Sequence, residues 1–158
     1  MSDKKVKIYV TLDTIFENEN VSYLINNNLA ITNKLFIDSL EKISKKFSKL
    51  VDIIFISKEK NEKIDSYVEN LKFNFKYELK YADNNEILKL HNKFTKDYVL
   101  IDINDELLIE WTKLCGKSIK YTDTKKPKKF FYEFLEIKNN YLSSDDYYCK
   151  LVNYIHLC

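Results

Sequence analysis

The chain contains no arginine and no glutamine, although lysine accounts for 26 of its 158 residues. The bidentate fork with which arginine reads guanine and phosphate is therefore absent, which argues against nucleic-acid recognition. A single glycine and a single proline exclude the glycine-rich loops that cradle phosphate groups in P-loop and dinucleotide-binding proteins. The surplus of lysine, asparagine, isoleucine, tyrosine and phenylalanine is typical of an AT-rich genome.

The chain also has few residues suited to disulfides, metal clusters or membrane insertion. Cys115, Cys149 and Cys158 have no C-x-x-C spacing, so we expect reduced thiols in a cytoplasmic protein. His91 and His156 have no acidic or cysteine neighbour at a convincing ligand spacing, and we expect structural roles for both. The first residues are charged and lead directly into an apolar segment, which does not indicate a signal peptide. No apolar run approaches the length of a membrane span, so we expect no membrane association.

What the chain does contain is enough apolar surface for a core. Apolar residues make up 45% of the sequence and aromatic residues 15%, with a net charge of +2, which excludes a disordered chain. A length of 158 residues suits one domain, and no linker or repeat divides it. We therefore expect a single domain over residues 1–158.

Short apolar segments alternate with amphipathic segments along the chain. Strands are predicted in Val6–Phe16, which ends in a polar corner, and at Ile53–Ile56, Phe73–Tyr81, Tyr98–Ile101 and Ser118–Tyr121. Helices are predicted at Lys34–Leu50 with Asn33 as cap, around Ile64–Leu71, after Asn84 or Asn85 as cap, at Glu106–Cys115 capped by Asn104 or Asp105, and twice beyond residue 125. The alternation predicts an α/β fold of three layers, in which helices cover both faces of a five-stranded, mostly parallel, Rossmann-like sheet.

Polar side chains stand where three of the predicted strands end. They are Thr11 and Asp13 after the first strand, Ser57 after the second, and Asp102 after the fourth. If the first strand is central, with the second and fourth strands on either side, these ends meet in one crevice. A lysine that precedes the fourth strand, Lys89, Lys93 or Lys96, could reach the same place. The alternative is that Asp13 and Asp102 have no role in ligand binding and each caps the turn after its strand.

Three segments carry a resemblance to a known family. Ile8–Phe16 resembles the first motif of the haloacid dehalogenase-like phosphohydrolases, an apolar strand followed by Asp-x-Asp-Gly-(Thr/Val)-(Leu/Ile). Ile54–Ser57 is similar to their second motif, a strand that ends in Ser or Thr. Leu100–Asp102, followed nine residues later by Trp111, is similar to the fourth motif of the 5′-nucleotidase-like branch, Ile-Asp-Asp-x-x-x-Asn-x-x-x-Trp. The resemblance implies the strand order fifth, fourth, first, second, third.

The chain departs from this family at the position of the nucleophile. In the family the first Asp of the first motif attacks the phosphoryl group and binds Mg²⁺, whereas this chain has Thr11. The second Asp, which is the family's general acid and base, is retained as Asp13, and the glycine after it has become Thr14. In the fourth motif Asp102 is retained, but the next acid has become Ile103. Asp13 and Asp102 would therefore form a weak Mg²⁺ site at most.

The resemblance and its departures lead to two functional expectations. The first is a catalytically inactive relative, with no cofactor or weakly bound Mg²⁺, that binds a nucleotide, another phosphate ligand or a protein partner in a regulatory, decoy or inhibitory role. Its ligand-binding residues would be Thr11, Asp13, Thr14, Ser57 and Lys93. The alternative is an active Mg²⁺-dependent nucleotidase, a phosphomonoester hydrolase, that uses Asp13 as catalytic residue and Asp102 with a water nucleophile. In either case the asparagine-rich segment Val21–Thr32, with a short helix near Val21–Ile25, would be a minimal cap over the crevice.

The last third of the chain suggests a third class of function. It is denser in aromatic residues than one core face requires, so it could cover the sheet or expose a sticky patch. In the second case the chain is a protein-interaction module, and a partner or a homodimer would contact Phe130, Phe131, Phe134, Tyr141 and Tyr147. The lysine run at residues 125–129 is expected to be a solvated loop.

Overall fold

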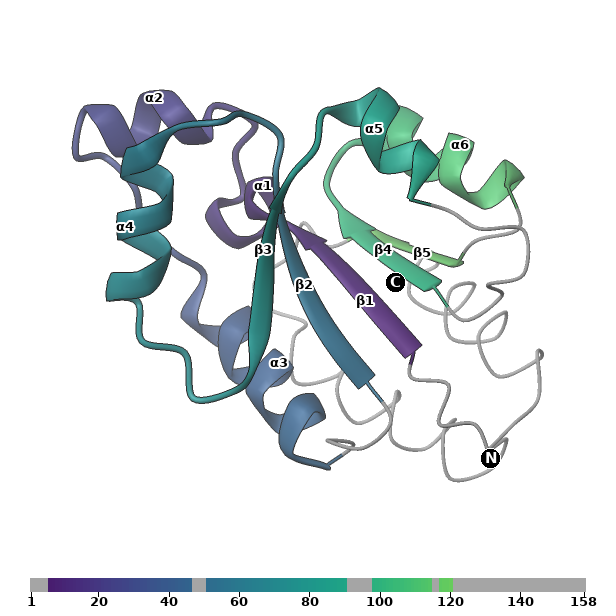
Figure 1. Ribbon diagram of the computed structural model, residues 1–158, viewed down its shortest axis with the longest axis horizontal. Helices are drawn as coiled ribbons and strands as arrows, with labels where there is room; N and C mark the ends of the chain where they lie inside the picture. The colour runs from purple at the N-terminus through teal and green to yellow at the C-terminus, as the bar shows by residue number, and fades with distance from the viewer. Residues whose placement is uncertain (1–5, 47–50, 91–97, 115–116, 121–158) are drawn as a thin grey trace.

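The computed structural model describes residues 6–46, 51–90, 98–114 and 117–120 of the chain (Figure 1). In chain order the elements are β1 (Val6–Thr11), α1 (Leu12–Phe16), α2 (Val21–Asn26), α3 (Lys34–Lys46), β2 (Val51–Ser57), α4 (Glu62–Asn70), β3 (Tyr77–Tyr81), α5 (Asn84–Lys89), β4 (Tyr98–Asp102), α6 (Asp105–Lys113) and β5 (Lys117–Lys120). Among these helices, none is long and apolar enough to cross a membrane.

The strands form one sheet in the order β3-β2-β1-β4-β5, and every neighbouring pair is parallel. The central strand is β1, in which Tyr9 lies opposite Ile54 of β2 on one side and Leu100 of β4 on the other. The near-continuous apolar sequence of β1 suits this place, because a strand with neighbours on both sides and helices on both faces exposes nothing to water. The predicted α/β class with a parallel sheet is confirmed, and the strand order agrees with the expected one.

Helices cover both faces of the sheet (Figure 1). On one face, Ile8 and Val10 of β1 belong to a buried cluster with residues of α3 and α4 such as Phe36 and Ile64. On the other face, Tyr9 belongs to a cluster with residues of α5 and α6, among them Ile87, Leu107, Leu108 and Trp111. Burying one such aliphatic or aromatic side chain contributes about 1.5–3 kcal/mol, so the two clusters fix the helices against the sheet.

Two predicted strand boundaries differ from the structure by more than two residues. The first strand ends at Thr11, because Leu12–Phe16 turns into the one-turn helix α1, which ends at Glu17 in the left-handed conformation (φ 52°). The third strand begins at Tyr77 and not at Phe73. Phe73 and Phe75 alternate as in a strand, but they do so because both rings pack against Phe55, with centroids 5.0 and 6.1 Å from its ring.

The predicted N-cap residues of α3 and α6 are confirmed by the structure, and that of α5 is not. Asn33 and Asn104 cap α3 and α6 as predicted, since their side chains accept from the backbone N–H of Phe36 and Leu107. The prediction of Asn84 or Asn85 as the cap of α5 is wrong. Asp83 takes that role and forms a capping box with Glu86, whose backbone N–H it accepts at 2.8 Å.

The short helix in the asparagine-rich segment is confirmed as α2, with one residue more than predicted.

Candidate functional site

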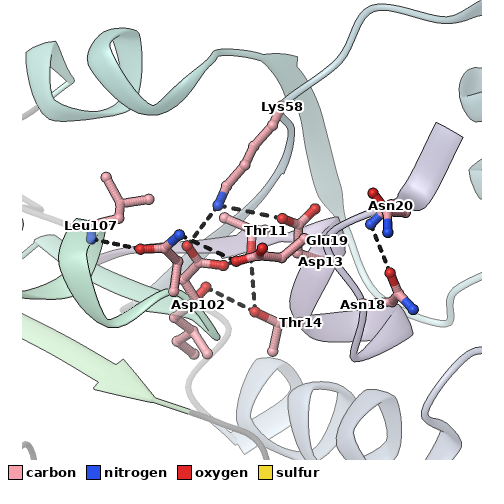
Figure 2. A network of polar contacts seen from close by, with 11 residues as sticks. Thr11, Asp13, Thr14, Asn18, Glu19, Asn20, Lys58, Asp102 and Leu107 are labelled. Carbon is pink, nitrogen blue, oxygen red and sulfur yellow. Dashed lines mark hydrogen bonds and ion pairs between the residues drawn. The ribbon is translucent and has the colours of Figure 1, made fainter.

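The candidate site lies where β1, β2 and β4 end. Thr11 lies opposite Ile56 of β2, and Val10 lies opposite Ile101 of β4, so the three carboxyl ends stand side by side. After β1 the chain continues to β2 and β3 on one side of it, and later crosses to β4 and β5 on the other side. The carboxyl end of β1 is therefore the topological switch point, where open α/β sheets bind ligands. The side chains that follow the three strand ends therefore face one another (Figure 2).

Thr11, Thr14 and Asp102 form a buried hydrogen-bonded group beneath this edge. The Thr11 hydroxyl donates to Oδ1 of Asp102 at 2.6 Å, and its oxygen lies 2.9 Å from the Thr14 hydroxyl. The Thr14 hydroxyl also lies 3.3 Å from the carbonyl oxygen of Ile101. Because the single proton of Thr11 goes to Asp102, the one proton of Thr14 is shared between the Thr11 oxygen and the carbonyl oxygen of Ile101. All three side chains belong to residues that are fully buried.

Lys58, the residue after β2, places its ammonium group between two carboxylates. Its Nζ lies 2.9 Å from Oδ2 of Asp102 and 3.4 Å from Oδ2 of Asp13 (Figure 2). The Lys58 side chain is 16% exposed, and those of Asp13 and Asp102 are 5% and 0% exposed. With Oδ1 bound to Thr11 and Oδ2 bound to Lys58, both oxygens of Asp102 have a donor.

Asp13 is compensated less completely. Burial raises the pKa of its carboxyl group from 3.8 to about 7; Lys58 lowers this pKa, and the negative charge of Asp102 raises it. One ammonium group cannot neutralise two carboxylates, and Asp102 lies closer to it than Asp13 does. A carboxyl group with a pKa near 7 can exchange a proton at neutral pH.

Above these residues opens a pocket of about 440 Å³. Its lining consists of four acids, three amides and one lysine: Asp13, Glu19, Glu59, Asp83, Asn84, Asn85, Asn104 and Lys58. Asn104 donates to Oε1 of Glu19 at 3.2 Å, which ties the start of α6 to the turn after α1. The pocket is therefore polar and acidic, and its one ammonium group is already paired with Asp102 and Asp13.

The structure brings Thr11, Asp13, Thr14 and Asp102 together as expected from the sequence. Ser57 is buried but stands apart, because its hydroxyl donates to the carbonyl oxygen of Glu59. Among the candidate lysines, Lys89 is an exposed residue of α5 that does not line the pocket.

Two sets of predicted residues, Lys93 with Lys96 and the aromatic set Phe130, Phe131, Phe134, Tyr141 and Tyr147, lie outside the described residues.

Sequence reasoning missed Lys58, the lysine that does reach the site. The signal was available in the sequence. Lys58 directly follows the end of β2, just as Asp13 stands two residues after β1 and Asp102 is the last residue of β4. It was hidden because the turn after β2 contains a second lysine, Lys60, and lysine is abundant throughout the chain.

The residues present do not fit the Mg²⁺ ion that the family resemblance implies. Magnesium requires several oxygen ligands at about 2.0–2.1 Å in octahedral arrangement. Thr11 offers a neutral oxygen whose proton is directed at Asp102, and both oxygens of Asp102 already accept hydrogen bonds. Within the described ranges, no group of three or more His, Cys, Asp or Glu side chains could hold a metal ion.

Comparisons of the chain with protein families, with curated proteins and with solved structures found no match.

Proposed function

We propose that this chain is a haloacid dehalogenase-like protein that has lost phosphoryl transfer and acts by binding. The observation that carries this proposal is the buried hydrogen bond from Thr11 to Asp102 at 2.6 Å, at the position where the family has its nucleophile. The parallel sheet with β1 at its centre and the single helical turn directly after β1 support the family assignment. The helix α2, which follows this turn, suits a minimal cap.

Thr11 has neither the access nor the charge that a nucleophile requires. Its residue is 0% exposed, so a substrate phosphorus atom cannot approach the hydroxyl oxygen without opening the site. A hydroxyl group also needs a base that removes its proton. Among the described residues, the carboxylate in contact with this hydroxyl is Asp102, whose Oδ1 accepts the hydrogen bond from Thr11 while its Oδ2 is paired with the Lys58 ammonium group.

The charge of the pocket favours a neutral or cationic group of the ligand over a free phosphate. Four carboxylates and one ammonium line it, and the ammonium is paired with two of the site's carboxylates. A phosphate dianion brought among these groups meets net negative charge at short range, where screening by salt is weak. A regulatory, decoy or inhibitory role requires binding without turnover.

A phosphatase screen tests the proposed loss of activity. Nucleoside monophosphates are incubated with the protein and millimolar Mg²⁺, and phosphate release is compared between the native chain and Asp13→Asn. We expect no difference between the two proteins. Turnover by the native chain that disappears in Asp13→Asn would overturn the proposal. A matched pair of ligands, a nucleoside and its 5′-monophosphate, tests the charge argument in a thermal shift experiment, and we expect the monophosphate to stabilise less.

One observation favours a second candidate, a phosphatase that activates water. Burial raises the pKa of Asp13 to about 7, which is the range of an efficient general acid or base at neutral pH. Asp13 is also in contact with the pocket. If this candidate is correct, the turnover found in the screen will show a bell-shaped or sigmoidal pH dependence with a midpoint near neutrality that is lost in Asp13→Asn.

A further inference from the structure

We infer that Lys58 is a built-in cation that replaces a divalent metal ion at this site, so that the folded protein needs no metal and binds none there. The inference rests on the proposed function insofar as both assign the site to a haloacid dehalogenase-like crevice. It goes further because it names the group that holds the crevice together. The conflict between the implied Mg²⁺ site and the residues present is its starting point.

The geometry of Lys58 is that of a bridging cation. Its ammonium group joins a carboxylate at the end of β4 to a carboxylate in α1, at Nζ–O distances of 2.9 and 3.4 Å. Lys58 itself follows β2, so its ammonium group connects residues of three separate parts of the chain (Figure 2). An ammonium group has three donors and can therefore serve carboxylate oxygens from several elements at once, as a metal ion does.

The neutral side chain at position 11 and the cationic side chain at position 58 are consistent with one charge balance. An aspartate at position 11 would give the crevice three carboxylates, and a divalent ion among them would leave one negative charge. With Thr11 the crevice has two carboxyl groups, and when both are ionised the single charge of Lys58 leaves the same balance. The loss of the carboxylate at position 11 and the presence of a lysine at position 58 thus form one consistent change from divalent to monovalent compensation.

A divalent ion would have to displace Lys58 in order to bind. The ammonium charge repels a second cation within a few ångströms, and the Lys58 side chain is 84% withdrawn from solvent, where this repulsion is screened little. Displacement would also leave only two carboxylates, and the hydroxyl of Thr11 would continue to donate to one of them. Among the described residues that line the pocket, no second cation could take over the role of Lys58.

The variant Lys58→Met tests the inference, because methionine keeps the length of the side chain and removes its charge. Two buried carboxylates then stand without a counter-charge, and we expect the melting temperature to fall by on the order of 10 °C. We expect millimolar Mg²⁺ or Mn²⁺ to restore a large part of this loss, since the vacated position now favours a cation. The native protein should show no such metal-dependent shift.

The control variant is Lys120→Met. Lys120 also forms an ion pair, 2.8 Å from Oδ1 of Asp105, but its side chain is 37% exposed and that of Asp105 is 65% exposed. We expect a shift of melting temperature of no more than about 2 °C and no response to metal, because exposed ion pairs contribute little. If Lys58→Met is as stable as Lys120→Met and equally indifferent to metal, the inference is wrong.

A second variant keeps the test decisive should Lys58→Met fail to fold. In the double variant Lys58→Met with Asp102→Asn, the uncompensated charge at the end of β4 is removed along with the lysine. We expect it to be more stable than Lys58→Met alone and to lose the metal response. A double variant less stable than the single one would contradict the inference.

A direct measurement of metal binding distinguishes a failure of this inference from a failure of the proposed function. Titration of the native protein with Mn²⁺, followed by electron paramagnetic resonance of the free ion, should show no binding that depends on Asp102. Tight binding that is lost in Asp102→Asn would overturn the inference even if the phosphatase screen finds no turnover. Metal-independent turnover would overturn the proposed function and leave the inference standing.

Discussion

At the scale of single residues, Asp13 is a buried carboxyl group whose charge the fold compensates incompletely. It is 3% exposed, it shares one ammonium group with Asp102, and burial raises its pKa from 3.8 to about 7. Below about pH 4 the carboxyl group is protonated in both the folded and the unfolded chain, so it costs nothing. Between about pH 4 and 7 the unfolded chain has released the proton and the folded chain retains it. The free energy of unfolding therefore falls as the pH rises through this window.

The variant Asp13→Asn should remove this pH dependence. Asparagine cannot ionise, so its stability does not fall in this pH window. The free energy of unfolding of the variant minus that of the native chain should therefore be larger at pH 8 than at pH 5, by about 2–4 kcal/mol for a shift of this size. Urea denaturation at both pH values measures the difference. Asp105→Asn serves as control, because it removes a carboxylate whose side chain is 65% exposed and that lies outside the group formed by Asp13, Lys58 and Asp102. An equal pH dependence in the native chain and Asp13→Asn would show that Asp13 is not buried as an excess charge.

At the scale of the elements, the end of α4 carries local strain. Lys72 follows the last turn of this helix with φ at 50°, and its backbone N–H donates to the carbonyl oxygen of Glu69 at 3.2 Å. This left-handed position after a helix is the one that glycine prefers, because a Cβ atom makes it unfavourable by about 1 kcal/mol.

The substitution Lys72→Gly should therefore stabilise the protein by about 0.5–1 kcal/mol. The matched control is Ser66→Gly, which lies at an exposed position within the same helix and should destabilise by about 0.5 kcal/mol. Chemical denaturation of both variants gives the two signs. A loss of stability in Lys72→Gly comparable with that in Ser66→Gly would mean that the left-handed turn is not formed.

The elements that could be predicted from sequence are those whose pattern has one physical cause. In α3, Phe36, Leu40 and Ile43 recur at helical spacing because a single face of the helix is buried, and the structure places all three in one cluster. The start of β3 was predicted wrongly, because the alternation of Phe73 and Phe75 comes from packing on Phe55 and not from pairing with a neighbouring strand. Alternation reports burial on one side, and strand pairing requires a partner that the local sequence does not contain.

The site could be predicted only in part, for a similar reason. Thr11, Asp13 and Asp102 were identifiable because each stands at a strand end within a recognisable pattern. The bond between Thr11 and Asp102 joins residues 91 positions apart, and the ion pair of Lys58 with Asp102 joins residues 44 positions apart. Such pairings depend on the order of strands in the sheet. Sequence alone therefore supplied the carboxylates but not the cation between them.

At the scale of the whole molecule, β1 couples the two layers of the core. Ile8 and Val10 point into the cluster that α3 and α4 cover, while Tyr9 points into the cluster that α5 and α6 cover. The Tyr9 ring packs edge-on against Trp111, with ring centroids 5.9 Å apart. Neither cluster can come apart without exposing one side of the central strand, which predicts a single cooperative unfolding transition for the described part of the chain.

The single tryptophan of the chain allows this coupling to be measured. Trp111 is 0% exposed and reports on the layer formed by α5 and α6, whereas circular dichroism reports on all helices. The two probes should give superimposable urea transitions, and acrylamide should quench the native fluorescence weakly. The variant Val10→Ala, on the opposite face of β1 from Trp111, should lower the free energy of unfolding by about 2 kcal/mol. Both transitions should therefore move together to lower urea concentration. If only the circular dichroism transition moves while the fluorescence transition stays in place, the two layers unfold independently and β1 does not couple them.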